Sequence, residues 1–391
     1  MLGQKPVPTH SSAYLETRKF GMPYKGKVAL VAEGGGQRGI FTAGVLDTWL
    51  DAGHDPFDIL IGTSAGSQNL TSFVARQKGY AKRLIRGLTR HRRFFQMGRG
   101  LMGKHIVDLD WYFDKTQEAN RLLDLDTAKA NVADREILFT ATNSRDRKAY
   151  YLDPMKSNHD WVELIKASSA LPLLYKQGVP LHIGVESKQA ANTDFYLDGG
   201  LAAPLPVTEA YKRGATKIVV IRTVDKGFQA QSPWLQKLSA VMCATGTCPK
   251  TIDYLLQHEQ AYQKELAFIE NPPEGVEVVQ IFASDKLQSK LLGSTDAQLR
   301  HDYKLGKQAG STFLETERKA IAFPQEANSQ PTASLHGENA TSAAAYFPKN
   351  ANGYMKSQHG ASNRKHAIKL PIPAPRKPNA GADDINSRMS A

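Results

Sequence analysis

One serine in this chain of 391 residues has the neighbours that a catalytic nucleophile requires. The run Gly62-Thr63-Ser64-Ala65-Gly66 fits the pattern G-x-S-x-G, with an apolar run before it and a helical pattern after it. In such a strand-to-helix turn the serine hydroxyl is exposed, and glycines such as Gly62 and Gly66 let neighbouring backbone approach without a Cβ clash. The amides at the start of the helix face the reacting centre. The pattern therefore predicts that Ser64 attacks a carbonyl carbon.

A glycine-rich run, Glu33-Gly34-Gly35-Gly36-Gln37-Arg38-Gly39, also lies between a strand pattern and a helix pattern. Consecutive glycines allow several backbone N–H groups to point the same way and bind negative charge. One interpretation is a phosphate-binding loop, although G-x-G-x-x-G fits only through Gly34, Gly36 and Gly39. The other is an oxyanion hole that stabilises the tetrahedral intermediate formed at the serine. Because the serine motif follows closely, we favour the oxyanion hole. Arg38 either braces this loop or contacts a lipid phosphate.

A serine nucleophile also needs a base, and the sequence offers an aspartate in place of a histidine. None of the 11 histidines lies in an evident catalytic motif, and we interpret His182 and His258 as structural. Asp198, followed by Gly199 and Gly200, comes directly after a short strand pattern. An unperturbed aspartate has a pKa near 3.9 and is a weak base, but partial burial raises that pKa. The alternative is that Asp198 only shapes a turn.

Four blocks together resemble the patatin-like phospholipases: Gly34–Gly39, Gly62–Gly66, Ala167–Pro172 (A-S-x-x-x-P in that family) and Asp198–Gly200. The resemblance covers roughly Lys27 to Arg222. It implies a lipid acyl hydrolase with a Ser–Asp dyad, in which Ser64 is the nucleophile, Asp198 is its base and no histidine takes part. Glu33 departs from the family pattern, since many members have aspartate there; we expect no effect on the dyad.

The resemblance also implies the residues around the dyad. The oxyanion hole would comprise Gly34, Gly35, Gly36 and Ala65, and the supporting motif residues would be Arg38, Gly39, Gly62, Gly66, Gly199 and Gly200. No cofactor and no metal is implied. Cys243 and Cys248 lack a second ligand pair for zinc and are interpreted as reduced structural cysteines.

Alternating strand and helix patterns from Lys27 to Arg222 predict an α/β protein, a three-layer sandwich around a mostly parallel sheet. Expected strands include Lys27–Ala32, Phe57–Ile61, Ile137–Thr142, Tyr150–Leu152, Phe195–Leu197 and Lys217–Ile221, with helices at Gly39–Asp51, Trp161–Ala167 and Val207–Lys212. We expect an N-terminal arm (1–26), a catalytic domain (27–222), a mostly helical extension packed on the core (223–322) and a disordered basic tail (323–391).

The net charge of +12 is concentrated in one segment. Residues 76–104 contain ten lysines and arginines and no acidic residue. Tyr80, Leu84 and Leu88 give this segment an apolar stripe, so it is either a solvated helix face or a surface for an anionic membrane. No motif suggests nucleic-acid binding. The sequence has no run of 18 apolar residues and no signal-peptide pattern, so we expect a cytoplasmic protein that is peripheral to the membrane at most.

Two other functions remain open at this stage. One is an esterase whose triad includes a histidine. The other is a non-catalytic lipid-binding or regulatory protein on the same fold. Dependence of the rate on a histidine, or failure of Ser64 to react with a fluorophosphonate, would distinguish these alternatives from the dyad.

Overall fold

The computed structural model describes residues 26–322, apart from 103, 173, 176–177, 184–192, 229–238 and 240–249. Residues 1–25 of the expected arm, the expected tail (323–391) and the two cysteines lie outside the described residues, so those expectations stay predictions. Among the described residues, no helix combines the length and the apolar composition needed to span a bilayer.

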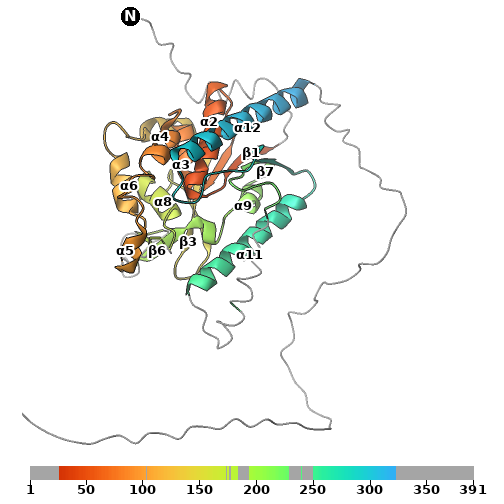
Figure 1. Ribbon diagram of the computed structural model, residues 1–391. Helices are drawn as coiled ribbons and strands as arrows, with labels where there is room; N and C mark the ends of the chain where they lie inside the picture. Colours follow the sequence, from red (N-terminus) through yellow and green to blue (C-terminus); the bar gives the residue numbers. More distant parts are fainter. Residues whose placement is uncertain are drawn as a thin grey trace, which may run out of the picture. The chain divides into compact units, whose positions relative to one another are not determined.

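An eight-stranded sheet forms the centre of the described chain (Figure 1). Its strands are β1 (Lys27–Ala32), β2 (Ile59–Thr63), β3 (Glu136–Asn143), β4 (Ala149–Leu152), β5 (Val179–Leu181), β6 (Asp194–Asp198), β7 (Ala215–Ile221) and β8 (Glu277–Ile281). The order is β5-β6-β3-β2-β1-β7-β8, and β4 pairs with β3. The four pairings from β3 through β2, β1 and β7 to β8 are parallel, whereas β3–β4, β3–β6 and β5–β6 are antiparallel. The sheet is therefore mixed, with its antiparallel part at one edge.

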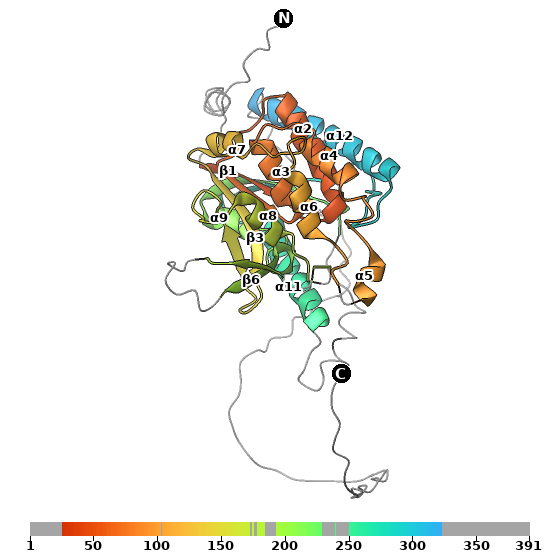
Figure 2. The ribbon, with the colours of Figure 1, turned by 90° about the vertical axis from the view of Figure 1, so that its left-hand side faces the viewer.

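Helices cover both faces of this sheet (Figures 1 and 2). They are α2 (Gly39–Asp51), α3 (Ala65–Val74), α4 (Tyr80–Gly87), α5 (Met97–Leu101), α6 (Leu109–Thr116), α7 (Leu125–Val132), α8 (Trp161–Ser168), α9 (Val207–Lys212), α11 (Lys250–Glu270) and α12 (Asp296–Ala322), with 3-10 turns at Gly36–Arg38 and Gly199–Leu201. The helices α2, α3, α4, α6, α8 and α12 pack on one face, and α9 and α11 pack on the other. The expected three-layer α/β fold is confirmed.

Alternation along β1 explains the two cores. Val28, Leu30 and Ala32 pack with the α2 side, whereas Ala29 and Val31 pack with the α9 side, because successive side chains of a strand point to opposite faces. All five are buried, as expected for a parallel strand covered on both sides.

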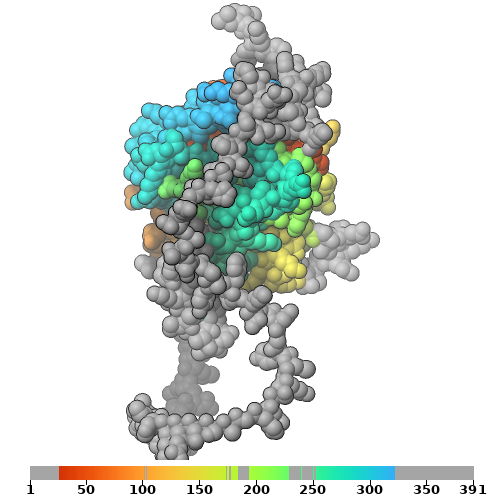
Figure 3. Space-filling view, turned by 90° about the vertical axis from the view of Figure 1, so that its right-hand side faces the viewer, coloured from red at the N-terminus to blue at the C-terminus, as the bar shows by residue number. Residues whose placement is uncertain are grey.

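The C-terminal helices are not separate from this sheet. β8 pairs in parallel with β7, so the expected extension beyond residue 222 supplies the edge strand. α12 packs along α2, where the indole of Trp49 donates to the Gly310 carbonyl at 3.3 Å. Figure 3 shows α11 and α12 on one face of the molecule, in teal and blue. The described residues from 250 to 322 therefore complete the same fold.

Candidate active site

Ser64 lies at a sharp turn between β2 and α3. Its φ of 54° and ψ of −121° are strained for a residue with a Cβ. The turn is tight, since a Cβ on Gly66 would lie 2.2 Å from the Ala32 carbonyl oxygen. α3 begins at the next residue, so the positive end of the helix dipole faces Ser64. The expected strand-turn-helix context of the motif is confirmed, although β2 begins two residues later than predicted.

Ser168, at the end of α8, supports this turn from a distant part of the sequence. Its hydroxyl oxygen accepts a hydrogen bond from the Ser64 amide at 2.9 Å and lies 2.9 Å from the Ser67 hydroxyl. Ser168 is fully buried. Its block was predicted only as part of the family resemblance, with no role assigned to Ser168. The structure shows that Ser168 fixes the backbone of the Ser64 turn.

Asp198 ends β6 and is almost completely buried. Its amide donates to the Ala170 carbonyl at 2.9 Å, and its Oδ1 accepts from the Gly200 amide at 2.8 Å. Burial raises the pKa of Asp198 from 3.8 to about 6, although hydrogen bonds from the Gly200 amide and the Ser64 hydroxyl and the electrostatic interaction with His258 each oppose that rise. The carboxyl group therefore changes its charge close to neutral pH.

The strand β3 explains how two residues so far apart in sequence meet. It lies between β2 and β6, and Thr140 of β3 pairs with Thr63, the residue before Ser64. The next residue, Ala141, pairs with Asp198. Because β6 runs antiparallel to β3, it ends level with the end of β2. The antiparallel edge of the sheet thus places the carboxylate beside the hydroxyl.

The glycine loop passes on the other side of Ser64. A Cβ on Gly34 would lie 3.2 Å from the Ser64 Cβ, so the two segments are in contact. Gly35 and Gly36 have φ values of 142° and 56°, which favour glycine. Within the described residues, the amides of Gly35, Gly36 and Ala65 donate to no protein acceptor. These amides have the chemistry of an oxyanion hole.

Glu33 lies behind this loop in a buried polar network. Its carboxylate accepts from the Thr223 amide and from the Tyr262 hydroxyl, each at 2.6 Å, and pairs with the Arg222 guanidinium at 3.4 Å. The Thr223 hydroxyl donates to the Gly34 carbonyl. This network could not be predicted from the sequence, because the partners of Glu33 come from α11 and from the two residues after β7 and have no motif of their own.

Arg38 was expected either to brace the glycine loop or to contact a lipid phosphate. Its Nε lies 3.5 Å from the Gly35 carbonyl oxygen, so its side chain contacts the loop it was expected to brace. Arg38 also lines a cavity beside the loop. Contact with a lipid phosphate stays a prediction.

Two cavities meet at Ser64 and Asp198. The narrow cavity has a volume of about 100 Å³ and is lined largely by apolar side chains, including Ile85, Phe113 and Leu174. The wide cavity has a volume of about 330 Å³ and adds polar groups. The wide-cavity residues with polar side chains include Arg38, Tyr254, His258 and Tyr262. Four residues line both cavities: Ser64, Leu171, Asp198 and Leu291.

Among the histidines singled out from the sequence, His258 is the one that reaches the site. Its Nδ1 lies 2.6 Å from the Gly200 carbonyl oxygen. A carbonyl oxygen only accepts, so Nδ1 carries the proton. His182 lies elsewhere, and its amide donates to His159. Within the described residues, no cluster of histidine, cysteine, aspartate or glutamate is suited to hold a metal ion.

Comparisons with known proteins agree with the resemblance seen in the motifs. A family model described as patatin-like phospholipase matches residues 30–211, and a model described as a domain of unknown function (DUF6363) matches residues 248–321. The uncharacterized protein YjjU of Escherichia coli (strain K12) is 39% identical over 323 residues, which are 82% of this chain and 85% of that protein.

Solved structures are similar to this chain at lower sequence identity than YjjU. VipD from Legionella pneumophila has 12% identity and a TM-score of 0.37, over 74% of this chain and 67% of that chain. Human GIVD cytosolic phospholipase A2 has 10% identity and a TM-score of 0.41, over 80% of this chain and 63% of that chain.

Proposed function

The chain belongs to the patatin-like phospholipase family, and we propose that it hydrolyses acyl esters of lipids through a dyad of Ser64 and Asp198. The observation that carries this proposal is the position of a buried carboxyl group, with a pKa of about 6, beside a strained serine where two cavities meet. A carboxylate with a pKa near neutral is a much better base than an ordinary aspartate.

In the proposed reaction, the Ser64 hydroxyl oxygen attacks the ester carbonyl carbon while its proton passes to Asp198. The negative charge on the former carbonyl oxygen is stabilised by the amides of Gly35, Gly36 and Ala65. The intermediate collapses, the bond to the leaving alcohol breaks, and Asp198 returns the proton to that alcohol. Water then attacks the acyl-serine, again with Asp198 as base, and releases the fatty acid.

The two cavities suggest how an ester would lie. The narrow cavity has an apolar lining, so it is suited to the acyl chain. The wide cavity combines apolar and polar groups, so it is suited to the alcohol part of the lipid. The ester bond would then lie at Ser64, which both cavities share.

The test is hydrolysis of a panel of phospholipids, triacylglycerols and acyl thioesters by the full chain, beside Ser64→Ala. A matched control is Ser311→Ala, a change of an exposed serine on α12. We expect release of fatty acid by the wild type and by Ser311→Ala, and a loss of about 10⁴-fold or more in Ser64→Ala. Release by Ser64→Ala at the wild-type rate would refute the proposal.

Contact with an anionic membrane also stays a proposal, with a smaller surface than the sequence suggested. Many charges of residues 76–104 are used in ion pairs inside the protein: Arg76 with Asp55, Lys78 with Asp51, Arg86 and Arg90 with Asp296, and Arg93 and Arg99 with Asp108. The outer part, around α5, also has two exposed methionines, Met97 and Met102. Figures 1 and 2 both place α5 at the periphery.

The outer part is therefore the proposed docking surface, with Arg92, Arg93 and Lys104 beside the methionines. Arg93 shares the single carboxylate of Asp108 with Arg99, and its side chain is 64% exposed, so it can still face an anionic surface. Each such cation near an anionic surface contributes about 1 kcal/mol. Changing all three to glutamine should weaken binding to phosphatidylglycerol vesicles at low salt by about 100-fold. The control changes three exposed lysines elsewhere to glutamine: Lys129, Lys156 and Lys319. Equal loss in both variants, or none in either, would contradict this surface.

A further inference from the structure

The segment of residues 288–295, between β8 and α12, lies directly against the glycine loop. The Gln37 amide donates to the Leu291 carbonyl at 3.0 Å. A Cβ on Gly36 would lie 2.4 Å from the same oxygen, so only glycine fits there. This segment belongs to the region matched by the model of a domain of unknown function. A part of that region thus touches the proposed oxyanion hole.

The side chain of Gln37 joins this segment to the catalytic domain. Its Nε2 donates to the Thr89 hydroxyl at 2.8 Å, and its Oε1 accepts from the Ser294 amide at 2.8 Å. Gln37 is almost completely buried. A single buried amide therefore links the glycine loop, the end of α4 and the start of α12, and its loss would leave buried partners without hydrogen bonds.

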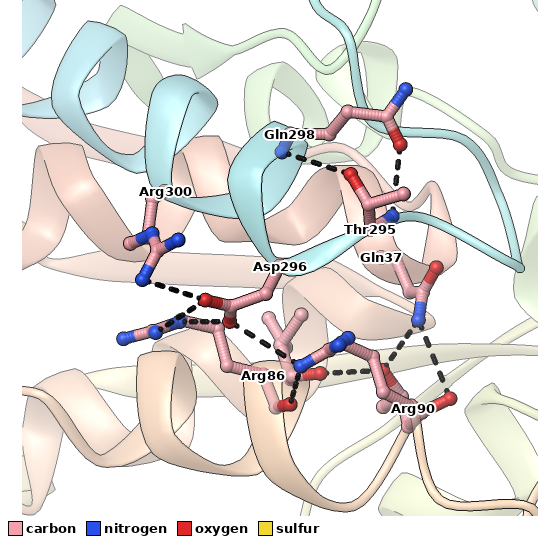
Figure 4. Close-up of polar contacts among 9 residues, drawn as sticks. Gln37, Arg86, Arg90, Thr295, Asp296, Gln298 and Arg300 are labelled. Carbon is pink, nitrogen blue, oxygen red and sulfur yellow. Dashed lines mark hydrogen bonds and ion pairs between the residues drawn. The ribbon is translucent and has the colours of Figure 1, made fainter.

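Charged groups hold the same segment at its C-terminal end (Figure 4). The Asp296 carboxylate forms a bidentate ion pair with the Arg86 guanidinium, at 2.9 and 3.0 Å, and also contacts Arg90 and Arg300. Thr295 and Gln298 exchange hydrogen bonds as a capping box at the start of α12. These contacts fix where the segment enters the helix.

At its N-terminal end the segment is held by a buried carboxylate. Asp302, on α12, accepts from the amides of Gln288 at 3.0 Å and Ser289 at 2.7 Å. Asp302 is completely buried. Both ends of the segment are thus tied to the fold, so Leu291 between them has a fixed position.

Leu291 itself lines both the narrow and the wide cavity, although the residue is 42% exposed. Leu171 is the other apolar residue common to the two cavities, but it lies next to Ala170, whose carbonyl holds the Asp198 backbone. Leu291 is therefore the apolar residue, common to both cavities, whose side chain can change size without moving the dyad.

We propose that residues 288–295 form a fixed wall of the catalytic site and that Leu291 determines which acyl chains the narrow cavity accepts. The assignment of the narrow cavity to the acyl chain rests on the proposed function. A cavity of about 100 Å³ is small for a long chain; for comparison, an apolar cavity of about 150 Å³ holds benzene. Leu291→Ala would enlarge the narrow cavity where it meets the wide one and admit longer chains, whereas Leu291→Phe would reduce the narrow cavity.

The experiment compares wild type, Leu291→Ala, Leu291→Phe and Leu122→Ala, a matched exposed leucine outside both cavities. The first measurement is kcat/KM for p-nitrophenyl butyrate and p-nitrophenyl palmitate. One or two methylenes in an apolar pocket change selectivity by about tenfold or more. We expect Leu291→Ala to raise the palmitate-to-butyrate ratio about tenfold, Leu291→Phe to lower it, and Leu122→Ala to leave it unchanged.

The second measurement does not depend on catalysis. Butyrate and palmitate binding is measured by calorimetry on the Ser64→Ala protein with each Leu291 variant, and the same order of preference is expected. If the wild type hydrolyses neither ester but Leu291 variants change fatty-acid binding, the proposed function is refuted and the proposed role of Leu291 is supported. If chain-length preference is the same in all variants in both measurements, the wall is refuted. Thermal melting checks the fold, which truncation of an exposed leucine should change little.

Discussion

Two buried carboxylates line the wide cavity, and their surroundings differ. Glu33, behind the glycine loop, has a guanidinium, a phenol hydroxyl and a backbone amide around it. Asp198, beside Ser64, has one backbone amide, and its other hydrogen-bond partner is the proposed nucleophile. Both side chains are nearly inaccessible to solvent.

We expect this difference to separate a structural acid from a reactive one. A buried charge with full hydrogen bonding and a counter-ion fixes the groups around it. A buried carboxylate with few partners binds a proton more readily, and burial does raise the pKa of Asp198 to about 6. Glu33 is therefore expected to hold the glycine loop, and Asp198 to exchange protons.

The largest effect should follow from removing the charge of the reactive acid. Asp198→Asn keeps the shape and an acceptor for the Gly200 amide but cannot take the Ser64 proton. General-base catalysis contributes about 10²–10⁴-fold, so we expect kcat to fall within that range, measured by fatty-acid release at pH 8. Retention of more than half of the activity would remove the distinction between the two carboxylates.

Loss of the structural acid should instead reduce stability. Glu33→Ala leaves Arg222 as a buried charge without its carboxylate, which typically costs about 3–5 kcal/mol. Urea unfolding measures this free energy, and Glu274→Ala, at an exposed position shortly before β8, is the control. Equal urea midpoints of unfolding for Glu33→Ala and the wild type would contradict the structural role of Glu33.

The pH dependence should show Asp198 in both rate and stability. Its folded-state pKa of about 6 exceeds the ordinary 3.8, so between these values the unfolded chain releases a proton that the folded chain keeps. The free energy of unfolding therefore falls by about 3 kcal/mol as the pH rises from 4 to 6, and it does not recover above pH 6.

Asp198→Asn should consequently be more stable than wild type at pH 8 by up to about 3 kcal/mol, with no advantage near pH 4. For the wild type, kcat/KM should rise through pH 6 and level off. Urea unfolding and initial rates at matched pH values test both points. An equal stability of the two proteins at every pH would show that Asp198 is not the poorly compensated group.

The smallest effect is expected at His258. Its Nδ1 proton is held by the Gly200 carbonyl, and its electrostatic interaction with Asp198 lowers the pKa of that carboxyl group. His258→Ala should lower kcat/KM by less than about tenfold and move the rise of the pH profile upward, whereas a triad histidine would cost about 10²–10⁴-fold. His159→Ala, outside both cavities, is the control.

Much of the fold and of the candidate site could be predicted from local sequence patterns. The strand before each motif and the helix after it depend on residues close in sequence, so β1 and α2 were predicted with their observed bounds. The positions of Ser64, Asp198 and the glycine loop followed from the same local signals. Their catalytic roles stay predictions.

The remainder depends on residues that only the fold brings together. The antiparallel direction of β6 and the ion pairs of Arg86 and Arg90 with Asp296, more than 200 residues away, leave no local pattern. Leu291 resembles any other surface leucine in the sequence. Its importance comes from the position of the segment that carries it.

The most direct test is covalent labelling with an alkyl fluorophosphonate, read by intact-protein and peptide mass spectrometry at pH 8. The dyad predicts one label, on Ser64, absent in Ser64→Ala, slowed at least tenfold in Asp198→Asn, and slower in wild type at pH 5 than at pH 8. A wild-type protein that stays unlabelled at Ser64, or an Asp198→Asn variant labelled as fast as wild type, would contradict the account.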